Sequence, residues 1–257
     1  MPPQVATVGA GSSPQEWYAS LPLVTKTFLT ALVLSAASVQ FGVLDPQKLL
    51  FSWPHIWHQF EIWRLVTPFA FAGGFGLPFA MHTYMMYNQC MSYEADPFNT
   101  GAGGGSADFI WMILLSMVQL GIFGYFNHER VLSSHLLYTI VYVQSRRSPE
   151  SVRSMFGFRF QNVYMPWVYV AINVLMGNPI MPCICGIIVG HVYFHLVDTV
   201  PKTSGFDVIS TPQFCQDIAR LAGDPLAAAR APQTGFRATG AGSHWGGAGR
   251  GRQLGSR

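Results

Sequence analysis

Residues 109–126 read FIWMILLSMVQLGIFGYF and contain no charged side chain. A transmembrane helix needs about 20 consecutive, predominantly apolar residues to cross the hydrocarbon core of a bilayer. This stretch therefore predicts a membrane-spanning helix. It already indicates that the fold is built in lipid and not in water.

Five further apolar segments accompany it, at residues 27–44, about 75–92, 131–144, 162–177 and 180–197. The sequence therefore predicts an all-α fold, a bundle of six transmembrane helices. The segments at 131–144 and 162–177 are shorter than a full crossing. Either their boundaries are misplaced by a few residues, or the bundle is short and the bilayer thins around it.

The composition agrees with a membrane protein. Half of the residues are hydrophobic and only 11% are charged, whereas a soluble domain carries about 25% charged residues. Residues 1–20 lack the basic region of a cleaved signal peptide, so we expect the first apolar segment to stay as a span. The four cysteines show no disulfide or zinc-site spacing. We expect a cytosolic N-terminal segment (1–20), a six-span domain (21–200) and a flexible cytosolic tail (201–257).

Basic residues predict the orientation of the bundle. The loop after the fourth segment carries Arg146, Arg147, Arg153 and Arg159, and the tail adds Lys202 and six arginines. The loops predicted on the other side hold few Lys or Arg. Because Lys and Arg are retained on the cytoplasmic side, we expect both termini and the arginine loop in the cytosol.

The predicted lumenal loop, residues 45–64 (DPQKLLFSWPHIWHQFEIWR), is unlike a solvated linker. It mixes tryptophan, phenylalanine and aliphatic residues with scattered polar ones, a composition suited to the membrane interface. We expect short helices that lie on or dip into the lumenal leaflet. An ordinary loop packed on the bundle is the alternative.

Trp63 and Arg64 end this loop. An arginine near hydrocarbon is costly unless it reaches water or finds acceptors. The guanidinium could bind backbone carbonyls or lipid phosphates while the tryptophan sits at the interface. The pair could equally be an ordinary interfacial anchor.

The last apolar segment contains Gly186 and Gly190, a GxxxG sequence that lets a second helix backbone approach closely. His191 and His195 lie four residues apart and so share one helix face. Val192 stands where a zincin has its glutamate, so metal binding is not expected. Packing or hydrogen bonding near the membrane edge is the preferred interpretation for both histidines.

An intramembrane serine protease is an alternative function, with Ser133 or Ser134 as nucleophile and His191 as base. The serines stand between Val131-Leu132 and His135, without a glycine that would open a tight turn or let a substrate approach the backbone. We therefore expect no catalytic residue. A small-solute transporter is a further alternative, but we find no internal repeat between the two halves.

Several short motifs, in order, together resemble the derlin family, the inactive branch of the rhomboid superfamily. They cover roughly residues 15–215. The matching stretches are residues 61–68 (EIWRLVTP), 107–109 (ADF), 142–147 (YVQSRR), 156–160 (FGFRF), 164–168 (YMPWV), 186–194 (GIIVGHVYF) and 210–214 (STPQF). Active rhomboids carry Gly-x-Ser-Gly before the fourth span. Here that site reads Leu132 to His135, so the resemblance implies a pseudoprotease.

The resemblance implies a role in endoplasmic-reticulum-associated degradation: retrotranslocation of misfolded client proteins through a thinned membrane and a lateral gap between the second and fifth spans. The implied partners are a membrane ubiquitin ligase complex, a cytosolic valosin-containing AAA+ ATPase, the lipid bilayer and further copies or relatives of the chain, with no nucleic acid and no cofactor. The implied family motifs are Trp63, Arg64, Gly186, Gly190 and His191. A tail box that resembles the family's ATPase-binding sequence comprises His244, Trp245, Gly246, Gly247 and Leu254, although its spacing is longer than usual.

Overall fold

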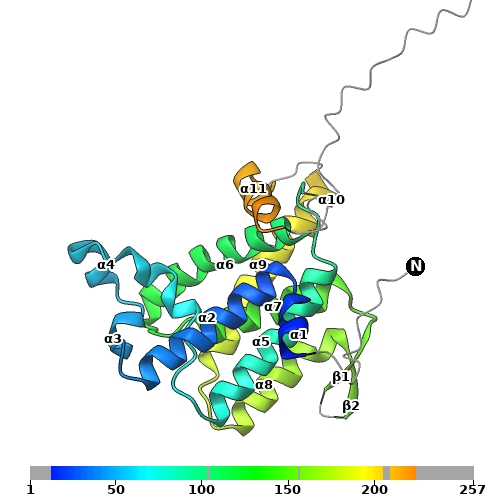
Figure 1. The fold of residues 1–257 in the computed structure, drawn as a ribbon. Helices are drawn as coiled ribbons and strands as arrows, with labels where there is room; N and C mark the ends of the chain where they lie inside the picture. Colours follow the sequence, from blue (N-terminus) through cyan, green and yellow to red (C-terminus); the bar gives the residue numbers. More distant parts are fainter. Residues whose placement is uncertain (1–12, 103–104, 156, 205–208, 224–257) are drawn as a thin grey trace, which may run out of the picture.

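The computed structural model describes residues 13–102, 105–155, 157–204 and 209–223. A helix lies in each of the six predicted segments, and the predicted all-α class is confirmed (Figure 1). The six helices are α2 (Leu23–Gln40), α5 (Leu77–Ala95), α6 (Ser106–Asn127), α7 (Ser133–Arg147), α8 (Met165–Leu175) and α9 (Met181–Phe194). α9 continues through a π-helical turn, His195–Thr199, into α10 (Val200–Ser204).

Among the residues that the structure describes, three helical stretches are long and apolar enough to cross a membrane: α2, α6 and the continuous run Met181–Thr203. α7 has 15 residues and α8 has 11. At 1.5 Å per residue they are roughly 22 and 16 Å long, whereas the hydrocarbon core is about 30 Å thick. The six-span topology therefore stays a prediction. α7 and α8 are short in the structure itself, so their shortness does not come from misplaced boundaries.

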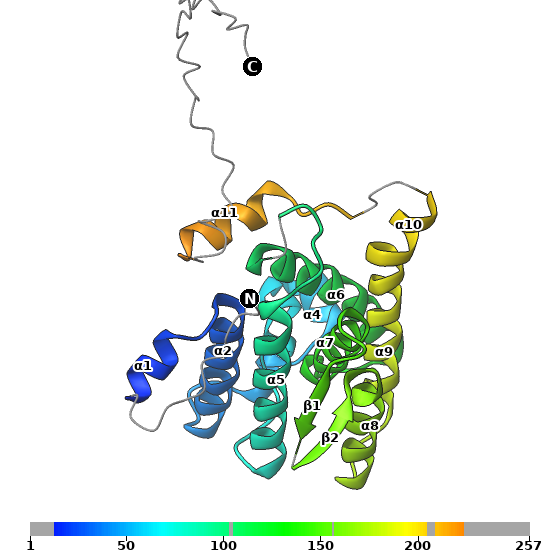
Figure 2. The ribbon, with the colours of Figure 1, turned by 90° about the vertical axis from the view of Figure 1, so that its right-hand side faces the viewer.

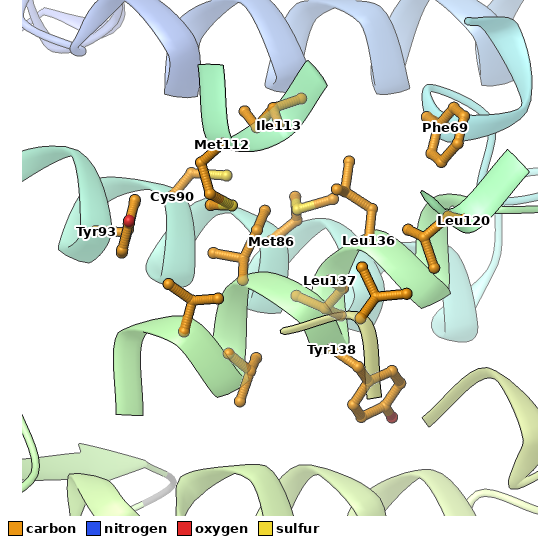
Figure 3. Close-up of a cluster of buried hydrophobic side chains, with 14 of the residues drawn as sticks. Phe69, Met86, Cys90, Tyr93, Met112, Ile113, Leu120, Leu136, Leu137 and Tyr138 are labelled. Atoms are coloured by element: carbon orange, nitrogen blue, oxygen red, sulfur yellow. The ribbon is translucent and has the colours of Figure 1, made fainter. Parts of the chain in front are cut away.

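Helix α7 forms the centre of the bundle. All of its residues are buried except Ser134, Arg146 and Arg147. α9 packs along it most extensively, α5 and α8 pack on it as well, and α2 packs on α5 and α6. Figure 3 shows side chains of α5, α6 and α7 pointing toward one another. The labelled core residues of these three helices are Met86, Cys90, Tyr93, Met112, Ile113, Leu120, Leu136, Leu137 and Tyr138.

The two ends of the bundle differ in character (Figure 1). One end, here the aromatic end, holds the short helices α3 (Pro46–Leu49) and α4 (Trp53–Gln59) and two 3₁₀ turns, Ile62–Leu65 and Thr67–Phe69. The predicted short helices in the 45–64 loop are thus confirmed. Trp57 is 69% exposed and Phe60 77%, which leaves large apolar area outside the bundle.

The other end, here the arginine-rich end, carries Arg146, Arg147, Arg153 and Arg159. It contains an antiparallel hairpin of β1 (Val152–Met155) and β2 (Phe158–Gln161), in which Arg153 faces Phe160. Gly157 has φ of 85°, which favours glycine at the turn. A 3₁₀ turn, Asn162–Tyr164, leads into α8. This hairpin was not predicted.

The first part of the tail that the sequence predicts to be flexible, from residue 201, contains a helix that packs on the bundle. α11 (Gln213–Leu221) packs on α6 with Cys215 and Ala219 buried. Thr211 explains the attachment: its amide donates to the Thr100 carbonyl (2.7 Å) and its hydroxyl to an Asp108 carboxylate oxygen (2.5 Å). Two of the stretches that resemble the derlin family, residues 107–109 and 210–214, therefore meet in space.

Candidate functional site

The candidate site is the seam between α5 and α8. Both helices pack on α7, but they share few contacts with each other. Figure 2 shows α5 and α8 on either side of the β1–β2 hairpin. Two cavities lie along the seam. One of about 170 Å³ lies toward the aromatic end, and one of about 190 Å³ lies beside the hairpin at the arginine-rich end.

One side-chain hydrogen bond closes the seam between the two cavities. Gln89 of α5 donates through Nε2 to the hydroxyl of Tyr169 of α8, at 2.7 Å, and both side chains are buried. Tyr138 of α7 donates to the backbone carbonyl of Tyr169 at 3.4 Å. This polar pair is a direct link between the two helices.

The cavity toward the aromatic end is partly polar. His82, Ser134, Asn173 and Asn178 line it together with methionine and proline side chains. His82 Nε2 is buried and has no hydrogen-bond partner. Polar groups in a membrane bundle face its interior or a water-filled cavity. The cavity therefore presents polar groups inside the bundle, between α5 and α8.

Arg64 acts as a structural clamp at the aromatic end. Its side chain is buried, and Nη1 donates to the carbonyls of Gln47 (2.6 Å) and Leu50 (3.0 Å). Nε forms an ion pair with Glu61. Of the alternatives left open by the sequence, the structure shows the guanidinium on backbone carbonyls. Trp63 is 51% exposed and points its apolar area outward.

The two halves of the Trp-Arg motif can be separated by mutation. Arg64→Ala is expected to lower the free energy of unfolding by about 2–4 kcal/mol, because two carbonyls and the Glu61 carboxylate lose a charged donor. Trp63→Ala, the neighbouring control, should stay within about 0.5 kcal/mol because the side chain is half exposed. Thermal unfolding in detergent measures both. Equal melting temperatures for the two variants would contradict the clamp.

Gly186 and Gly190 set the approach of α9 to α7. A Cβ at Gly186 would lie 2.6 Å from the Tyr138 Cβ and closer still to the His135 carbonyl oxygen. A Cβ at Gly190 would lie 3.0 Å from the Thr139 carbonyl oxygen. The GxxxG sequence therefore mediates packing within the bundle, as the pattern predicts.

His191 lies at the arginine-rich end of α9. Its Nδ1 and the Tyr142 hydroxyl are hydrogen-bonded at 2.6 Å, and Arg146 donates to the same hydroxyl. Tyr142 is eight residues from Ser134 on α7, roughly 12 Å along the helix axis. The structure therefore does not bring Ser134 and His191 together as the protease alternative requires. Ser134 instead shares its cavity with His82.

Sequence reasoning missed Glu94, which is 2% exposed at the end of α5. It accepts hydrogen bonds from the amides of Val24 (2.8 Å) and Thr25 (2.9 Å), from the Thr25 hydroxyl (2.9 Å) and from Ser106 (2.8 Å). These amides open α2, whose N-cap residue, Pro22, supplies no side-chain cap. Glu94 lies two residues beyond the predicted apolar segment 75–92, and a carboxylate so close to a membrane span is itself a signal of a specific partner.

The predicted tail box lies outside the described residues. His244, Trp245, Gly246, Gly247 and Leu254 all fall there.

The apolar helices, the short α7 and α8 and the GxxxG contact are the features of a polytopic helical membrane protein. The sequence model of the Der1-like family matches residues 21–213 of the chain. The chain is 31% identical to Derlin-1.2 of Zea mays over 237 residues (90% of this chain, 96% of the relative). It is 32% identical to Derlin-2 of Oryza sativa subsp. japonica over 244 residues (90% and 94%) and 32% identical to Derlin-1 of Arabidopsis thaliana over 225 residues (85% and 83%). The chain belongs to the Der1-like, or derlin, family.

Proposed function

We propose that this protein is a non-enzymatic component of endoplasmic-reticulum-associated degradation that helps misfolded proteins pass from the lumen to the cytosol. The α5–α8 seam carries the proposal. It has polar cavities at both ends and is joined in the middle by the Gln89–Tyr169 hydrogen bond. A client segment enters there from the bilayer, and separation of one polar pair admits it.

The shortness of α7 and α8 supports a low barrier at this place. A helix shorter than the hydrocarbon core is accommodated when the bilayer thins. A polar segment that enters a thinned region crosses less hydrocarbon, so its transfer costs less free energy. The exposed Trp53, Trp57 and Trp63 at the aromatic end suit an interfacial position that fixes this depth.

The proposed orientation follows from the arginines. With the arginine-rich end in the cytosol, both termini are cytosolic and the aromatic end is lumenal. The same proposal sets the domain limits at residues 20 and 200. It includes a membrane ubiquitin ligase complex and a cytosolic AAA+ ATPase as partners, and assembly with further copies or relatives of the chain. The six crossings and the pseudoprotease character belong to it too. The chain supplies no ATP-binding motif that we identify, so the pulling force comes from the ATPase.

A photocrosslinking experiment tests the seam. A photoreactive amino acid at Ile172, which lines the cavity toward the aromatic end, is expected to capture a misfolded client in cells when the ATPase is inhibited. Leu34 on α2, 60% exposed and away from the seam, is the matched control. Equal capture at both positions, or capture at Leu34 alone, would refute a client path between α5 and α8.

A further inference from the structure

The cavity beside the hairpin contains an arginine without a counter-charge. Arg153 of β1 lines it, and Arg153 Nε is buried with no hydrogen-bond partner. No Asp or Glu is among the described residues that line this cavity. A buried polar group without a hydrogen-bond partner destabilises the protein, and a ligand that supplies the partner removes this cost. Arg147 of the same end provides a contrast, since it forms an ion pair with Asp96 at 2.9 Å.

The remaining walls of the cavity supply neutral donors. Asn88 and Gln89 of α5 and Tyr169 of α8 line it. The Tyr169 hydroxyl accepts from Gln89, so its own proton is available to donate. Asn88 Nδ2 uses one of its two protons on the Tyr84 carbonyl at 2.7 Å. A guanidinium with a hydroxyl and an amide, and without a carboxylate, suits a ligand that is negative and offers several acceptor oxygens.

Electrostatics point the same way. Burial lowers the pKa of the Arg153 guanidinium from its ordinary value, and only the weaker influence of Tyr169 opposes this. The group stays protonated at neutral pH because an arginine pKa is ordinarily above 12. The result is a partly desolvated positive charge at the end of the seam, which a negative group stabilises.

We propose that this cavity binds a phosphate group, and that in the membrane the group is the headgroup of an anionic phospholipid held between α5, β1 and α8. The place of the cavity favours a lipid. It lies between α5 and α8 beside the β1–β2 hairpin, at the end of the seam, and a headgroup held there lets the acyl chains follow the seam. A lipid in this position packs beside the Gln89–Tyr169 pair and occupies the path until a client displaces it.

The binding experiment uses the full-length protein in neutral detergent and titrates phosphatidic acid, phosphatidylcholine and inorganic phosphate separately. Protection against thermal unfolding reports the affinity. Phosphatidic acid is expected to raise the melting temperature and phosphatidylcholine is not. Arg153→Gln should weaken phosphatidic acid binding by roughly tenfold or more, as expected for loss of one charged donor.

Arg159→Gln is the matched control, because Arg159 belongs to the same hairpin and does not line the cavity. It should bind phosphatidic acid as the unmodified protein does. Arg153→Lys retains the charge and should recover part of the affinity, which separates loss of binding from loss of fold. Equal binding by the unmodified protein and Arg153→Gln, or equal weakening by both glutamine variants, overturns the proposal.

Inorganic phosphate distinguishes the source of the ligand. If free phosphate binds through Arg153 as strongly as phosphatidic acid does, the cavity is a phosphate site, and the proposal that its ligand is a lipid is refuted. Displacement of bound phosphatidic acid by an acidic peptide, with no effect of phosphate, would show a peptide site and overturn the proposal. The inference goes beyond retrotranslocation, and because lipid affinity is measured without a client, it can fail while the proposed function stands.

Discussion

Gly186→Val is expected to abolish the native bundle. A Cβ at this position would already meet the Tyr138 Cβ at 2.6 Å and the His135 backbone, so two helix backbones and not a flexible side chain must move. Overpacking of a well-packed core usually costs about 1–3 kcal/mol. Here α9 must leave its main partner, α7, and we expect about 4 kcal/mol or more, at the extreme of single substitutions.

The chain provides its own probe for this loss. Cys90, Cys183, Cys185 and Cys215 are all free and buried. Burial, and to a smaller extent the nearby Asp108, raises the pKa of the Cys215 thiol, so it is protonated and unreactive in the folded protein. A thiol-reactive dye therefore reports unfolding as temperature rises. Gly186→Val should react at low temperature.

A graded glycine series is the control. Gly190→Ala needs shifts of a few tenths of an ångström and is expected to cost about 1–2 kcal/mol. Gly121→Ala on α6 meets nothing within 4 Å and should be neutral or slightly stabilising, because alanine favours a helix over glycine by about 1 kcal/mol. Equal melting temperatures for the Gly186→Val and Gly121→Ala proteins would show that Gly186 does not set the α7–α9 distance.

Glu94→Ala is the second substitution with a large expected effect. It leaves two opening amides of α2 and the hydroxyls of Thr25 and Ser106 without their acceptor. Each buried donor left unpaired costs about 1–3 kcal/mol, and a carboxylate at a helix N-terminus also interacts favourably with the helix dipole. We expect a loss of about 3–5 kcal/mol, with α2 detaching from α5 and α6 first.

Glu94→Gln separates the acceptor from the shape. The glutamine side chain has one carbonyl oxygen, which keeps part of the contacts, but its amide group faces other donors. The stability of the Glu94→Gln protein should therefore fall between those of the unmodified protein and of Glu94→Ala. Asp96→Asn is the matched control, because Asp96 is exposed and its ion pair with Arg147 contributes about 0–1 kcal/mol. Thiol reactivity and protease sensitivity near residue 23 are the measurements. An Asp96→Asn protein as unstable as Glu94→Ala would refute the assignment.

The predicted helices are found in the structure because the sequence signal for a membrane helix is local. Five of the six segments begin and end within about three residues of the observed helices, and α2 begins four residues before its predicted start. Helical hydrogen bonds form within the segment, so apolar composition alone predicts the element. The GxxxG contact was also predictable, since close approach requires only the absence of side chains.

The partners of polar residues were not predictable. Arg64 reaches carbonyls 14 and 17 residues away, and Glu94 reaches an amide 70 residues away. The sequence marked Arg64 as costly without naming its acceptors. It predicted no structure for α11 or the hairpin, because both are short segments held by packing and by contacts such as Thr211 to Asp108.

The sequence by itself determined that this is a helical membrane protein, the order of its helices, and the motifs that place it with the derlins. Only the tertiary structure decided which helices are neighbours, that α5 and α8 meet through Gln89 and Tyr169, and that Arg153 lies unpaired beside them. The reason is the solvent. In lipid, the buried and the outward faces of a helix are both apolar, so the hydrophobic pattern that reports the inner face of a soluble helix gives little information on which face meets which partner.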